Sequence, residues 1–252
     1  MNIDVKDTPM PALRCFRPRS APSSAAQALR SGGLGGAVVA LLLLHAVPSA
    51  AQDRGLSVIE RAGDRYASVE TVCADFTQRL EVPLLGSERT GTGRLCTGRP
   101  NLFAMRFADP AGDLIVVDGD FAWVYFPSND AKTVLKTTAE RSAGGRDFHR
   151  EFLVDPSSKY DVAYEAEEML DGRATHRIRM RPKGPASYRA AVLWIDDGAP
   201  VLRRLRLEEE NGNVRTITLA DVVFGADVGI EWFTFTPPEG ALVMEPGTRG
   251  GR

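Results

Sequence analysis

Few side chains in this sequence have the types and spacing of a catalytic site. Beyond the first fifty residues the chain has two histidines, His149 and His176. His149 could act as a general base, but no nucleophile lies near it in the sequence, so we expect it on the surface of a covering helix. The GxSxG, HExxH, CxxC, Walker and GxGxxG motifs do not occur. We therefore expect no catalytic residues and a protein that is not an enzyme.

Four aspartates lie close together in the sequence and could be pictured around calcium: Asp109, Asp113, Asp118 and Asp120. A calcium loop needs ligands at alternating positions, as in the pattern DxDxDG, and these four lack that spacing. They fall instead where the chain is expected to turn, a position that aspartate favours. We expect no metal site and no cofactor.

The apolar side chains carry the stronger signal. In RPNLFAMRF (99–107), read as a strand, Phe103, Met105 and Phe107 share one face, because side chains alternate between faces. In FAWVYF (121–126), Trp123 and Tyr125 share a face in the same way. Each residue alone could simply fill a core. Together they supply more apolar surface than two short helices can cover, so we interpret these five residues as the lining of an apolar cavity.

The N-terminal region, residues 1–51, is typical of a secretory signal peptide with a long basic leader. It is rich in Ser, Ala, Pro and Gly, carries several arginines, and ends in a short apolar run closed by small residues. We expect cleavage near Ala51 and export to the periplasm. Residues 52–252 are then one domain with a net negative charge and no basic cluster, which argues against nucleic-acid binding.

Two cysteines lie outside this leader, Cys73 and Cys96, since Cys15 lies within it. The turn VPLLGS has its midpoint between residues 84 and 85, so position 73 faces position 96 if the flanking segments pair as strands. Opposed β-carbons are about 4.5–5.5 Å apart, slightly more than a disulfide prefers. An exported protein could bridge this pair, and two buried free thiols are the alternative.

The remaining pattern predicts a mainly β fold (α+β). Apolar residues at helical spacing indicate a helix over 55–69, and a helical insertion is expected at 140–156. Between and after them, ten or eleven strands alternate with turns, the last at FTFTPP (233–238). Acidic runs at 165–168 and 208–210 are typical of solvated strand edges. We expect a single large antiparallel sheet of about 11 strands, curled into an incomplete barrel, with helices covering its concave face.

Five segments resemble, in order, the periplasmic outer-membrane lipoprotein carrier protein family, LolA: ADFTQ (74–78), GRPNLFAMRF (98–107), DP (109–110), VVDGDFAWVYFP (116–127) and FTFTPPEG (233–240). The resemblance covers most of residues 55–241 and is weak across 160–220. It implies an incomplete barrel of eleven strands whose helices cover a hydrophobic cavity. It also implies the partners: acylated lipoproteins, an inner-membrane ABC-type lipoprotein-releasing complex and an outer-membrane lipoprotein receptor.

The resemblance also assigns a role to Arg99. In the family, an arginine followed by proline hydrogen-bonds backbone carbonyls of the covering helices and keeps the empty cavity shut, and Arg99 occupies that position. An ordinary surface arginine is the alternative. One departure is Cys96, which stands where an aromatic residue often precedes the Arg-Pro pair. We expect a monomer.

A second interpretation is a periplasmic carrier or sensor for another lipid, such as a glycolipid or terpenoid, that uses the same half-barrel cavity. An apolar wall does not by itself distinguish one aliphatic ligand from another. Sensors of this fold usually carry a further domain, for which residues 52–252 leave no room.

Overall fold

The computed structural model describes residues 48–139 and 148–245. The predicted signal peptide lies outside these residues except for its last four, which form the start of helix α1 (Pro48–Ala67). The helix therefore begins earlier than the predicted residue 55 and ends two residues before 69. Its buried side includes Ile59, Ala62 and Tyr66, three or four residues apart, as an amphipathic helix requires.

Twelve strands form one sheet. Their bounds are β1 Thr71–Val82, β2 Ser87–Gly98, β3 Leu102–Asp109, β4 Leu114–Asp118, β5 Phe121–Tyr125, β6 Thr133–Thr138, β7 Tyr160–Leu170, β8 Arg173–Pro182, β9 Tyr188–Asp196, β10 Leu202–Glu209, β11 Val214–Phe224 and β12 Leu242–Met244. Short helical turns lie between them: η1 Pro83–Leu85, η3 His149–Leu153, α2 Pro156–Lys159 and η4 Ile230–Phe233.

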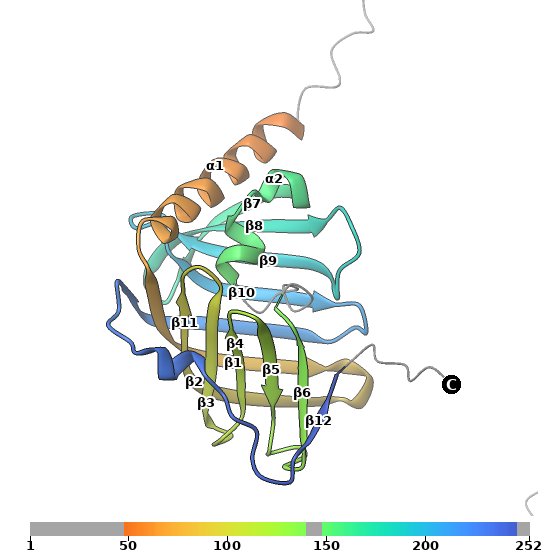
Figure 1. Cartoon of the computed structure of the whole chain (residues 1–252). Coiled ribbons are helices and arrows are strands. Elements are labelled where there is room, and N and C mark those ends of the chain that lie inside the picture. Colours follow the sequence, from red (N-terminus) through yellow and green to blue (C-terminus); the bar gives the residue numbers. More distant parts are fainter. Residues whose placement is uncertain (1–47, 140–147, 246–252) are drawn as a thin grey trace, which may run out of the picture. The chain divides into compact units, whose positions relative to one another are not determined.

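The sheet consists of two antiparallel runs of strands, β1–β6 and β7–β11, that join through the pair β1–β11. Only β12 departs from this pattern within the described residues, since it pairs parallel with β6 at one end of the sheet. The end strands β12 and β7 each adjoin one neighbour, so the sheet is not closed. Figure 1 shows β3–β6 running across the direction of β8–β11, a strong bend of the sheet. The predicted incomplete barrel is thus confirmed, with twelve strands.

The main core lies on the concave side of this sheet. Helix α1 contributes Ile59 and Tyr66 to it, and η3 contributes Phe152 and Leu153, all packed against side chains of the strands. We call α1 and η3 together the helical cover. Figure 1 shows α1 beside β7 and the helical turn of η3 in front of the strands β8–β10. The prediction that helices cover the concave face is confirmed.

A second, smaller core lies on the outer face of β2–β5. The chain after β11 returns over this face, and Phe233 is buried there beside Cys73, Cys96 and Ala104. Arg106 fixes the segment, because its Nη2 donates to the carbonyl oxygens of Trp232 and Thr234 at 3.1 and 2.9 Å. The predicted strand at FTFTPP is therefore wrong: Phe233 ends the helical turn η4, and 234–238 belong to no strand.

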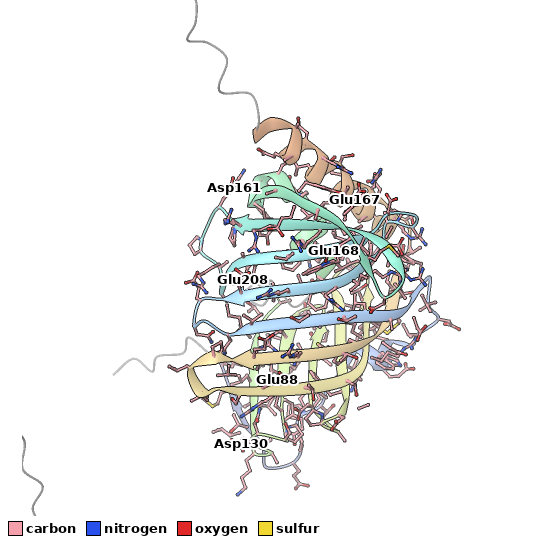
Figure 2. All side chains as sticks on the ribbon, turned by 180° about the vertical axis from the view of Figure 1, so that it is seen from behind. Glu88, Asp130, Asp161, Glu167, Glu168 and Glu208 are labelled. Atoms are coloured by element: carbon pink, nitrogen blue, oxygen red, sulfur yellow. A yellow bond between two sulfur atoms is a disulfide. The ribbon has the colours of Figure 1, made fainter. Side chains whose placement is uncertain are left out.

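The outer face of β7–β11 is highly charged. Glu168 receives a hydrogen bond from Arg177 Nη1 at 2.9 Å, and Glu208 receives one from Arg179 Nη1 at 3.2 Å. Figure 2 shows both carboxylates from behind, on the side away from the helical cover. Glu168 thus pairs with the adjacent strand β8, and Glu208 on β10 pairs with Arg179 on β8 across the intervening strand β9. These acids are therefore part of cross-strand ion pairs rather than isolated solvated edges.

Candidate functional site

A pocket of about 220 Å³ lies on the concave side of the sheet. Phe103 and Met105 of β3 form part of its wall, as the alternation of β3 predicts, and both are almost fully buried. Its other apolar side chains come from β4, β5, β10, β11 and the residues next to β5 and η3: Ile115, Val124, Leu207, Ile217, Phe126 and Phe148. A pocket with such walls suits an aliphatic ligand.

Phe107 shares the face of Phe103 and Met105 but is not among the residues that line the pocket. Its ring packs edge-on against Phe76 and Phe126, with centroid distances of 4.9 and 6.1 Å. Phe126 lines the pocket, whereas Phe107 supports it.

Trp123 and Tyr125 lie on the opposite face, which corrects the prediction that they line the cavity. Their rings pack against Phe235 of the segment on the outer face, with centroid distances of 6.0 and 5.6 Å. Trp123 Nε1 also donates to a carboxylate oxygen of Asp118 at 2.7 Å. Because side chains alternate along β5, Val124 faces the pocket instead.

The helical cover lies in direct contact with the wall of the pocket. Phe148, which leads into η3, lines the pocket, and its ring lies 6.1 Å from that of Phe103 in an edge-to-face arrangement. Gly63 of α1 meets the backbone of Leu153 so closely that a β-carbon there would lie 2.7 Å from the carbonyl oxygen. Glycine is therefore required for α1 and η3 to approach this closely.

Arg99 holds the end of α1. Its Nε donates to the carbonyl oxygen of Val69 at 2.8 Å, and its Nη2 donates to that of Ala67, the last residue of the helix. The final carbonyls of a helix lack intrahelical partners and carry partial negative charge, so a guanidinium is favourable there. Arg99 also borders a second cleft, of about 610 Å³, between the end of α1 and η3.

His149 lies in the same region and is half-buried, so it is not the surface histidine that we expected. Its ring stacks on Tyr66 of α1, with a centroid distance of 5.6 Å and an interplanar angle of 14°. Burial, with smaller contributions from the charges of Arg99, Arg150 and Lys159, lowers the pKa of His149 to about 4. The imidazole is neutral at ordinary pH, which suits its packing against an aromatic ring.

A polar cluster that the sequence did not indicate ties η3 to the sheet. The carboxylate of Glu151 accepts hydrogen bonds from the hydroxyls of Tyr160 on β7 and Tyr188 on β9. The two hydroxyl oxygens are 2.7 Å apart. Burial, and next the bond to Glu151, raise the pKa of Tyr188. Lys159 adds bonds from Nζ to the carbonyl oxygens of Arg150 and Glu151, at 2.8 and 2.7 Å.

Cys73 and Cys96 form a disulfide on the outer side of the first hairpin. They are directly opposed in the β1–β2 register, as the position of the turn predicts, with Cα atoms 4.1 Å apart. Both are fully buried. The bridge fixes the strand from which Arg99 emerges three residues later.

Within residues 48–139 and 148–245, no three or more His, Cys, Asp and Glu side chains gather in a way that could bind a metal ion. None of the helices in this part of the chain has the length and hydrophobicity of a membrane span.

Comparison with known proteins relates this chain to a family. Two curated relatives are named outer-membrane lipoprotein carrier protein. That of Alkalilimnicola ehrlichii is 28% identical over 74% of this chain and 82% of its own length. That of Halorhodospira halophila is 28% identical over 82% of this chain and 92% of its own.

A solved structure of the Pseudomonas aeruginosa MucA/MucB complex is also similar, with 16% identity, a TM-score of 0.43, and coverage of 73% of this chain and 61% of that one. That likeness is too low to bear on function. The sequence profile described as outer membrane lipoprotein carrier protein LolA matches residues 67–236, more than half of the chain. The chain therefore belongs to the LolA family of outer membrane lipoprotein carrier proteins.

Proposed function

We propose that this protein is a periplasmic carrier that binds the acyl chains of lipoproteins released from the inner membrane and delivers them to an outer-membrane receptor. The inner-membrane partner is an ABC-type lipoprotein-releasing complex. The observation that carries this proposal is the apolar pocket behind Phe103 and Met105, enclosed by a helical cover. Family membership supports the same role.

The physical need for such a carrier is large. Each methylene group kept from water is worth about 0.8 kcal/mol, so an acylated protein does not leave a membrane for water unaided. The apolar walls of the pocket give the acyl chains an environment that replaces the membrane interior. Met105 adds an unbranched, adaptable side chain, which suits mobile acyl chains.

The pocket must enlarge to take its cargo. At about 220 Å³ it is smaller than the roughly 300–1,000 Å³ of pockets that hold drug-sized ligands. The conformation described here is accordingly the closed one, and loading requires α1 and η3 to move away from the sheet. The bonds of Arg99 to Ala67 and Val69 favour the closed form, so they compete with bound cargo and keep its affinity low enough for release.

Depletion in cells tests the proposal. We expect lipoproteins to accumulate in the inner membrane, and the purified protein to bind one released lipoprotein per chain. Intact lipoprotein sorting after depletion would contradict the proposal.

The alternative, a carrier or sensor for another lipid, draws on the same observation, because aliphatic and aromatic walls accept many acyl chains. A mass spectrum of lipids that co-purify with the protein separates the two. Abundant glycolipid or terpenoid would favour the alternative, and acylated peptides would favour the lipoprotein carrier.

A further inference from the structure

One end of the 220 Å³ pocket is polar, although the rest of its wall is apolar. Gln78 of β1, Arg215 of β11 and Glu209 of β10 all line it. Each belongs to the inward-facing row of its strand. Gln78 and Glu209 follow apolar residues of that row, such as Phe76 and Leu207, and Arg215 precedes Ile217. Three adjacent strands thus change from apolar to polar at the same end of the pocket.

The register of the strands brings these three side chains into one oblique row. Gln78 pairs with Ile217 and Leu80 pairs with Arg215, so Gln78 and Arg215 are diagonal neighbours across the β1–β11 pair. Leu207 likewise pairs with Arg215, and Glu209 lies two residues beyond it. Diagonal neighbours on one face are about 7–8 Å apart, within reach of long side chains.

Arg215 is held at the centre of this row by its two neighbours. Its Nη1 donates to Gln78 Oε1 and its Nε donates to Glu209 Oε1, both at 3.0 Å. Its Nη2 has no hydrogen bond to any residue that the structure describes. The side chains of Arg215 and Glu209 are 32% and 18% exposed, so the pair borders the pocket and is only partly in water.

The position of Arg215 distinguishes it from Arg204 and Arg206 of the neighbouring strand β10. Arg204 and Arg206 of β10 alternate with the buried Leu205 and Leu207, so they project from the outer face. A shelter for hydrocarbon alone needs no guanidinium in its wall. A fixed guanidinium at the end of an apolar pocket, whose Nη2 has no partner among the described residues, matches an amphipathic ligand whose polar end carries an oxygen acceptor.

We propose that Arg215 binds a carbonyl or carboxylate oxygen at the head of the acyl chain, with Gln78 and Glu209 as positioning residues for its guanidinium. This inference rests on the proposed carrier function and names the part of the cargo that is recognised. Glu209 balances the charge of Arg215, so the site favours the ester or amide carbonyls of an acylated lipoprotein over a highly charged headgroup.

The test compares lipids that differ only at the head. Two synthetic lipopeptides carry the same two alkyl chains, one pair joined by esters and the other by ethers, which lack the carbonyl oxygens. We expect the wild-type protein to bind the ester form about tenfold more tightly, the effect of one hydrogen bond to a charged group. In Arg215→Gln this preference should disappear, while affinity for the ether form stays unchanged.

The matched control is Arg206→Gln, on the outer face of β10, which should keep the tenfold preference. The bound oxygen could belong to an acylated lipoprotein or to a free fatty acid. Palmitic acid as a competitor distinguishes these two sources. Displacement of the ester lipopeptide by an equal concentration of palmitic acid would assign the site to free fatty acid, and weak competition would assign it to the lipoprotein.

The outcomes separate the two proposals. Equal binding of ester and ether lipopeptides by the wild-type protein would overturn the role of Arg215 and leave the carrier function intact. Binding of neither lipopeptide would overturn the carrier function and the inference with it. The comparison within the wild-type protein does not depend on whether Arg215→Gln folds.

Discussion

Gly63 of α1 and Leu153 of η3 lie in direct contact, where the two parts of the helical cover meet. A β-carbon at Gly63 would lie 2.7 Å from the carbonyl oxygen of Leu153, a distance that real β-carbons do not show. The two segments can therefore pack together only because residue 63 has no side chain. Their contact is therefore sensitive to added volume.

Gly63→Ala should open the cover. Alanine favours a helix over glycine by about 1 kcal/mol, so this change would stabilise an isolated α1. In the closed protein the clash should outweigh that gain and lower the free energy of unfolding by about 1–3 kcal/mol. Hydrogen exchange of the η3 amides should become faster. Gly184→Ala is the control, since no atom lies within 4 Å of its expected β-carbon. Unchanged exchange in Gly63→Ala would contradict this account.

Arg99→Leu should load cargo but release it poorly. Without the bonds to Ala67 and Val69 the closed form loses stability, and cargo meets less competition. Transfer of a bound lipoprotein to acceptor membranes that contain the receptor should slow at least tenfold. Arg89→Leu, which removes a side-chain bond to Asn129, a residue far from α1 in the sequence, should transfer normally. If Arg99→Leu transfers as fast as wild type, Arg99 has no part in release.

Acid should destabilise the closed cover through His149. The folded protein holds its pKa at about 4, below the usual 6.5, because the ring is buried and near Arg99, Arg150 and Lys159. Between pH 6.5 and 4 the unfolded chain binds a proton that the folded chain does not. The stabilisation is therefore complete above pH 6.5 and is lost as pH falls to 4, at a slope of at most about 1.4 kcal/mol per pH unit.

His149→Phe should remove this contribution and keep the stacking on Tyr66. Urea unfolding at pH 7 and pH 4.5 measures the effect as a smaller loss of stability in the variant than in wild type. An equal loss in both proteins would mean that other groups cause the acid sensitivity.

Removal of the Cys73–Cys96 bridge should cost stability without abolishing the fold. A disulfide across a loop of this length restricts the unfolded chain and typically contributes about 2–4 kcal/mol. The double change Cys73→Ala and Cys96→Ala should lower the free energy of unfolding in urea by that amount. A reducing agent should have the same effect on wild type and none on the variant. Equal stability of the two proteins would show that the bridge contributes nothing.

Local pattern predicted much of this structure. The turn VPLLGS fixes the register of the first hairpin, so the opposition of Cys73 and Cys96 follows from counting residues. Alternation in β3 likewise predicts that Phe103 and Met105 share the inner face. In both cases the information lies within about 25 residues of sequence.

The features that the sequence did not predict depend on contacts between distant parts of the chain. Both rows of FAWVYF are apolar, so alternation cannot say which row faces inward. Phe235, more than a hundred residues away, decides this by covering Trp123 and Tyr125 from outside. Glu151 similarly meets Tyr160 and Tyr188 only in the folded chain.

The polar end of the pocket lay within reach of sequence reasoning. Alternation along β10 from Leu205 and Leu207 places Glu209 on the inner face, but the run of three glutamates suggested a solvated edge. The adjacent Glu208 fits that expectation in part, since it faces outward and pairs with Arg179. A run of like residues in a strand has members on both faces.

Fluorescence quenching tests most directly whether acyl chains occupy the concave side. Of the three tryptophans, Trp194 and Trp232 belong to clusters on the outer face, and Trp123 packs there against Phe235. A lipopeptide with brominated acyl chains, which quench indole at contact, should therefore leave wild-type emission nearly unchanged. With Phe103→Trp, saturating lipopeptide should abolish most of the added emission. Two results would contradict the cavity as the site of binding: strong quenching of the wild-type emission, or no quenching of the emission added by Phe103→Trp.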